Sequence, residues 1–202
     1  MILDLFLYFA KFPLLDGVKR IATKGASNMP EYAELLQQLE RQEEHSLIPG
    51  IGNYIYGQSF EDLKGRLDRI TGSFLFVDYG EMRTSADRIQ SLQVSERLAI
   101  TVAFKLAQTD ALEQAIASER TLQMLATLYS FLLADIETGA FRYADRPAIG
   151  NTEIVPFVSS ELSAYGWTLM LSVSSPDALG IREQFKSFMR HTLINNFAEK
   201  RT

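Results

Sequence analysis

The stretch LAITVAFKL, residues 98–106, constrains the fold more than any other part of this chain. Large apolar side chains alternate strictly with small or polar ones. Because successive side chains of a strand point to opposite faces of a sheet, this alternation is typical of a half-buried β-strand. We therefore predict a strand in the interior of a sheet. Its core face is expected to carry Leu98, Ile100, Val102, Phe104 and Leu106.

A long helix, residues 111–136, is predicted to follow this strand and to pack on the sheet. Asp110 and Glu113 have the spacing of a capping box, with Asp in place of the usual Ser or Thr, and Gly139 is placed to end the helix in the left-handed conformation. Apolar residues recur between them at helical spacing. The predicted sheet-facing stripe is Leu112, Ala115, Ile116, Leu122, Leu125, Ala126, Tyr129, Leu132, Leu133 and Ile136.

Three further strands are predicted. SFLFVDYGEM, from residue 73, is rich in β-forming residues, and Gly80 is expected to end or bulge this strand. Residues 152–158 and 166–174 form two more candidates, of which Pro156 places the first at a sheet edge or a bulge. The inward face of the last strand is expected to carry Trp167, Leu169, Leu171 and Val173. Between the first two strands, RTSADRIQSLQVSE is polar and is expected to form a long mobile connection.

The N-terminal third predicts helices and an irregular segment. MILDLFLYFAKFPLL is too short to cross a bilayer, which takes about 20 residues, and is expected to form a buried or partner-packed helix. From Pro30, PEYAELLQQLERQEE predicts a second helix with one apolar face. Five glycines and Pro49 punctuate the next stretch, so residues 45–72 are expected to be irregular apart from a short helix near 59–70.

The fold class that follows is α+β, with a mainly antiparallel sheet packed by the long amphipathic helix and with additional N- and C-terminal helices. Residues 1–202 are expected to form one domain, in which 73–175 make the core and 1–30 an N-terminal helical arm. The C-terminal helix is predicted at 177–199. Its apolar row carries Phe185, Phe188, Met189, Leu193 and Phe197.

Composition excludes several classes of function. The chain has no cysteine, which removes disulfides, thiol catalysis and thiolate zinc sites and is compatible with a cytoplasmic location. A net charge of −5 gives no general attraction for nucleic acid, so nucleic acid is not expected as the main ligand. No membrane association is expected either.

The residues that carry chemistry form no recognisable site. His45 and His191 are far apart and outside any metal-binding spacing, and both are expected on the surface. Asp78 and Glu81 could bind a divalent cation or act as acid and base, but a solvated strand end is the favoured interpretation. The glycines lack phosphate-loop spacing, and no serine lies in a nucleophile elbow. We therefore predict no catalytic, metal-binding or cofactor-binding residues and no cofactor.

The order of elements from residue 73 is strand, loop, strand, capped helix, strand and strand, ending in GWTLMLSV. This order resembles that of tail-terminator and related tail-completion proteins of long-tailed bacteriophages, over about 100 residues. The resemblance implies a non-enzymatic protein that forms rings, commonly hexameric, and caps the tail tube where it joins the head. The N-terminal 30 residues and the extended C-terminal helix lie outside that pattern.

The implied partners are other copies of the chain and phage tail-tube or head-connector proteins, with final assembly into the virion. The connection between the first two strands would then be a contact element, and its candidate interaction residues are Met82, Arg83, Arg88 and Ile89. The alternative is a small-molecule-binding or enzymatic α+β domain. Its pocket would lie between sheet and helix, and its site would combine dispersed residues such as Asp78, Glu81 and Arg83.

Overall fold

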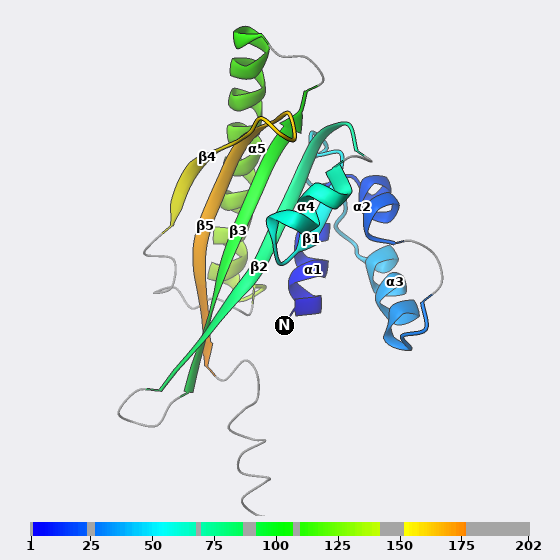
Figure 1. Ribbon diagram of the computed structural model, residues 1–202. Helices are drawn as coiled ribbons and strands as arrows, with labels where there is room; N and C mark the ends of the chain where they lie inside the picture. The colour runs from blue at the N-terminus through cyan, green and yellow to red at the C-terminus, as the bar shows by residue number, and fades with distance from the viewer. Residues whose placement is uncertain are drawn as a thin grey trace, which may run out of the picture.

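A computed structural model describes residues 2–23, 27–67, 70–86, 92–106, 110–141 and 152–176 (Figure 1). The described residues form a five-stranded sheet with the strand order β1-β2-β3-β5-β4, in which only β1 and β2 are parallel. The strands are β1 (Tyr54–Gly57), β2 (Gly72–Ala86), β3 (Leu92–Lys105), β4 (Glu153–Ser159) and β5 (Ala164–Pro176). One long helix packs on the sheet, so the α+β class is confirmed.

Strand β3 is the central strand of the sheet, as predicted. Leu98, Ile100 and Val102 are fully buried on the face toward helix α5 (Ala111–Thr138). The opposite face is also buried, because Thr101 is 3% and Ala103 0% exposed. The prediction of a half-buried strand was therefore wrong in its middle, where small side chains let a second layer pack closely. Toward the end of the strand, Phe104 and Leu106 are only partly buried.

Helix α5 begins and ends where the sequence predicts. The Asp110 carboxylate accepts a hydrogen bond from the Glu113 amide at 2.8 Å, and Gly139 adopts a left-handed φ of 75°. The predicted stripe was wrong in part, because Leu112 is 69% and Ile116 45% exposed, and Ala115 and Ala126 are exposed as well. The row that packs inward is Ala117, Thr121, Leu125, Leu128, Leu132 and Ile136.

Helix α1 (Ile2–Ala10) is part of the main core. Its Leu5 and Phe9 are fully buried in the same cluster as the inward row of α5. The prediction of a buried N-terminal helix is confirmed. Two more helices follow, α2 (Leu15–Ala22) and α3 (Glu31–Arg41). No helix in the described ranges has both the length and the apolar character needed to cross a membrane.

The segment predicted to be irregular contains a strand as well as the expected short helix, α4 (Phe60–Leu67). β1 has only four residues, too few for its sequence to show alternation, and its parallel pairing with β2 makes it a strand. On the face opposite α5, Leu63 of α4 closes a second cluster. The other members of that cluster are Ile21, Ile55, Ile70, Phe74, Phe76, Ala103, Leu162 and Ala164.

The expected long connection between β2 and β3 is mostly strand. Residues 81–86 pair with 92–97, and β5 continues the pairing through residues 172–176. We call this three-stranded extension the tongue; Figure 1 shows it running past the ends of α1 and α5. Backbone pairing between the strands forms the tongue although its sequence is largely polar. The polarity of these residues alone did not indicate strands. The predicted C-terminal helix, 177–199, lies outside the described residues.

Candidate functional site

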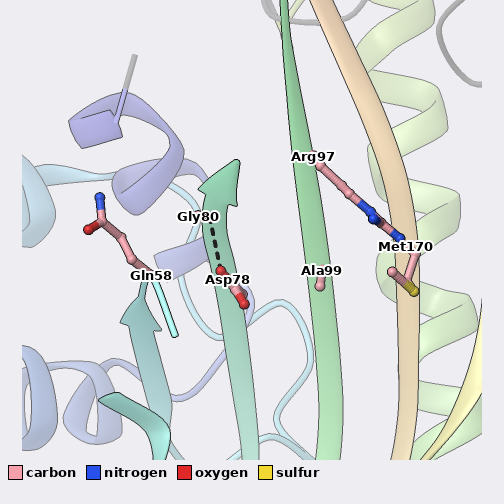
Figure 2. Close-up of a pocket in the computed structure, with 6 residues that line it drawn as sticks. All are labelled: Gln58, Asp78, Gly80, Arg97, Ala99 and Met170. Atoms are coloured by element: carbon pink, nitrogen blue, oxygen red, sulfur yellow. Dashed lines mark hydrogen bonds between the residues drawn. The ribbon is translucent and has the colours of Figure 1, made fainter. Parts of the chain in front are cut away.

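A polar depression of about 360 Å³ lies on the sheet face opposite α5 (Figure 2). It spans the sheet from the end of β1 to β5, across the middle strands. Its lining residues are Gln58, Asp78, Gly80, Arg97, Ala99 and Met170. The alternative interpretation placed a pocket between sheet and helix, whereas the described residues fill that interface with apolar side chains.

A β-bulge shapes one wall of the depression. The pairing of β2 with β3 shifts register between Asp78 and Glu81, as the glycine at position 80 predicted. The Gly80 amide donates a hydrogen bond to the Asp78 carboxylate at 3.0 Å. A Cβ at position 80 would lie 2.7 Å from the Gln58 carbonyl oxygen, so the close approach of β1 and β2 requires glycine here.

Charges of opposite sign lie on the two sides of the depression. The Asp78 carboxylate points from β2 toward β3, while the Arg97 side chain runs across toward Met170 on β5 (Figure 2). Ala99 lies between Asp78 and Met170 in the register, and its small side chain leaves space above the sheet. This arrangement can hold a small polar ligand that carries both charges. It presents no nucleophile paired with a base.

One of the residues that the sequence singled out for chemistry lies in this depression. Asp78 lines the depression, whereas Glu81, Met82 and Arg83 lie in the β2 part of the tongue. The other two candidate contact residues, Arg88 and Ile89, lie outside the described residues. Sequence reasoning missed Gln58 and Arg97. Gln58 follows a strand that was not predicted, and Arg97 is one of several charges beside a clear strand.

A second polar cluster joins α1 to α5. Asp135 accepts hydrogen bonds from the Tyr8 hydroxyl at 2.8 Å and from Lys11 Nζ at 2.7 Å. Lys11 also lies 4.3 Å from the centre of the Tyr8 ring, a cation–π distance. Burial, and then the hydrogen bond to Asp135, raise the pKa of Tyr8 well above its usual value. Tyr8 therefore remains a hydrogen-bond donor, which suits a structural link.

Asn53 holds the start of β1 in place. Its side-chain amide donates to the carbonyl oxygens of Thr71 and Ser73, at 3.1 and 2.8 Å, and its oxygen accepts a hydrogen bond from Arg20 of α2. Asn53 is only 1% exposed, so these bonds satisfy a buried side chain. The hydrogen bonds of Asn53 therefore serve to hold the fold together.

The histidines form no site within the described part of the chain. His45 is partly buried after α3, and its Nδ1 has no hydrogen-bond partner among the described residues. His191 lies outside them. Across the same ranges, no group of three or more His, Cys, Asp or Glu side chains is placed to hold a metal ion.

Comparison with known proteins gives no relative from which a function can be carried over. No family model, no curated protein and no solved structure matches this chain.

Proposed function

We propose that this chain is a non-enzymatic structural protein of a phage or prophage, similar to tail-terminator proteins. It acts by forming rings and by contacting tail-tube or head-connector proteins. The observation that carries the proposal is the tongue, which extends the sheet beyond the helices that cover its core (Figure 1).

The tongue offers two strand edges for pairing with another chain. β1 pairs with β2 only as far as Asp78, and β4 pairs with β5 only as far as Met170. Along the tongue, the outer edges of β2 and β5 therefore have no neighbouring strand among the described residues. An open edge is a template on which a partner chain can add a strand. Head-to-tail contacts of this kind, between different surfaces of two copies, form a ring when the rotation between neighbouring copies closes.

Shortening the tongue tests the proposal. Arg83 and Ser95 are directly paired, so replacing residues 84–94 by Asn-Gly should close a two-residue hairpin at that pair. We expect the shortened protein to stay folded, with a far-ultraviolet circular dichroism spectrum that loses only the strand signal of the deleted residues. Its binding to purified tail tubes from the same genome should fall at least about 10-fold, a loss of roughly 1.4 kcal/mol in binding free energy. Co-sedimentation with the tubes measures this binding.

Two further variants sharpen the experiment. Thr127→Lys changes an exposed residue on the outer side of α5 and should leave binding unchanged. The double variant Arg88→Ala, Ile89→Ala tests the predicted contact residues directly and should weaken binding. If the shortened protein binds tubes as tightly as the wild type, the assembly role of the tongue is wrong.

The depression on the sheet favours a second candidate function, the binding of a small zwitterionic molecule. A carboxylate and a guanidinium on its two sides would pair with the opposite charges of such a ligand. Thermal-shift measurements with a panel of free amino acids, repeated with Arg97→Ala, test this function. Stabilisation that disappears in the variant, together with no binding to tail tubes, would favour the small-molecule function over assembly.

A further inference from the structure

An apolar groove of about 170 Å³ lies between α1 and α3. α1 contributes Leu3 and Phe6 to its lining, and Thr23, just after α2, contributes as well. The remaining lining residues belong to α3. The α3 residues are Tyr32, Leu35, Leu36 and Leu39. No charged residue lines this groove, in contrast to the depression on the sheet.

The apolar face of α3 is incompletely covered. Leu39 is 1% exposed, but Leu35 and Leu36 are only partly buried and Leu3 across the groove is 50% exposed. An amphipathic helix gains most of its stability from burying its apolar face. A second helix with an apolar face could therefore bind in the groove and complete the burial of α3.

We propose that the C-terminal segment, residues 181–199, binds in this groove as an amphipathic helix. Its sequence places apolar residues three or four positions apart, which is the spacing of a helix that docks into a groove. The residues of that row are Phe185, Phe188, Met189, Leu193 and Phe197. Large apolar anchors of this kind fit an apolar groove better than they fit the polar depression. This inference is independent of the phage function.

The charges beside the groove complement those of the segment. Residues 31–44 contain five acidic residues and one basic residue. Residues 181–199 contain three basic residues and two acidic ones, and Lys200 and Arg201 follow them. This difference in charge favours the docking of a basic segment over that of an acidic one, although Glu40 and Glu44 already pair with Lys19 and Lys11.

β5 ends at Pro176 at the tip of the tongue, and Figure 1 shows this tip toward the same lower end as the start of α1 and of α3. The residues between β5 and the proposed helix, 177–180, span up to about 13 Å when extended. The proposal covers docking in the groove of the same chain and docking in that of an adjacent copy, and the experiment below distinguishes these arrangements.

The absence of cysteine from the chain allows a direct cross-linking test in the full-length protein. The test variant carries Leu36→Cys and Phe188→Cys. The matched control carries Gln37→Cys and Phe188→Cys, because Gln37 is the next residue of α3 and is exposed on its other side. We expect disulfide formation under mild oxidation at least about 10-fold faster in the test variant, since docking raises the effective thiol concentration. On a non-reducing gel, a monomer band indicates docking within one chain and a dimer band docking between copies.

A second measurement does not depend on cysteine. Backbone amides of residues 185–197 should exchange slowly in the wild type. They should lose protection at least about 10-fold in Leu36→Asp, but not in Gln37→Asp, because only the first change places a charge in the groove. Equal cross-linking of the two cysteine pairs, or equal exchange in the two Asp variants, would overturn the proposal. Rapid dimerisation of Leu36→Cys alone would also overturn it and would assign the groove to a second copy of α3.

Discussion

At the scale of single residues, Asp135 links the N-terminal region of the chain to helix α5. Its carboxylate joins Tyr8 and Lys11 of the N-terminal region to the last turn of α5. The Lys11 side chain is 12% exposed and lies over the rings of Tyr8 and Phe12, so protein groups replace most of the water around its ammonium group. A mostly buried cation that loses its carboxylate retains its desolvation penalty without compensation.

We therefore predict that Asp135→Ala destabilises the protein by about 2 kcal/mol or more, somewhat less than for a fully buried pair because the carboxylate is partly hydrated. Glu44 provides a matched control. It approaches the same Lys11 nitrogen at 3.5 Å, but its side chain is 66% exposed. Glu44→Ala should change the free energy of unfolding by less than about 0.5 kcal/mol. Urea unfolding measures both values, and equal losses would show that Asp135 has no special structural role.

At the scale of elements, the rotation of α5 on the sheet is set by contacts outside the helix. The indole nitrogen of Trp167 in β5 donates to the Ser118 carbonyl oxygen at 3.0 Å. Apolar residues of α5 are spread around much of the circumference of the helix. Its sequence is therefore compatible with more than one inward row. The contacts with β3 and β5 select the row that contains Leu125 and leave Leu112 in solvent.

This rotation predicts different effects for two leucines of the same helix. Leu125→Ala should destabilise the protein by about 2 to 5 kcal/mol, since Leu125 is fully buried and its truncation leaves a cavity. Leu112→Ala should change stability by less than about 0.5 kcal/mol, because Leu112 is 69% exposed. Chemical denaturation of both variants gives the comparison. A larger loss for Leu112 would indicate that the row predicted from the sequence is the one that packs.

At the scale of the whole molecule, the sheet separates two apolar clusters. The larger cluster joins α1 and α5 on one face, and the smaller one includes Leu63 of α4 on the other. α1 is far from α5 in the sequence, yet Phe9 is fully buried between segments that the chain supplies much later. The core is therefore complete only when the N-terminal helix is in place.

Truncating Phe9 tests this dependence on the N-terminal helix. Phe9→Ala should destabilise the molecule by about 3 to 5 kcal/mol, as expected for a buried aromatic residue. Ile2→Ala in the same helix should lower stability by less than about 1 kcal/mol, because Ile2 is 37% exposed. Thermal unfolding monitored by circular dichroism distinguishes the two. Similar small losses would show that α1 is a dispensable arm.

The sequence by itself determined the elements whose signals are local. Strict alternation indicated β3, the spacing of Asp110 and Glu113 indicated the start of α5, and Gly139 indicated its end. Each of these features acts through side chains within a few residues of the backbone that they shape. Pro156 likewise indicated the edge position of β4, which the register with β5 confirms.

Only the tertiary structure decided the features that depend on partners distant in the sequence. β1 is a strand because β2 lies beside it, and the tongue is strand because residues 81–86, 92–97 and 172–176 pair with one another. The depression likewise joins Gln58, Asp78 and Arg97 from three separate segments. Strand pairing and burial are free energies of contact between such segments, so a local pattern predicts an element but not its neighbours.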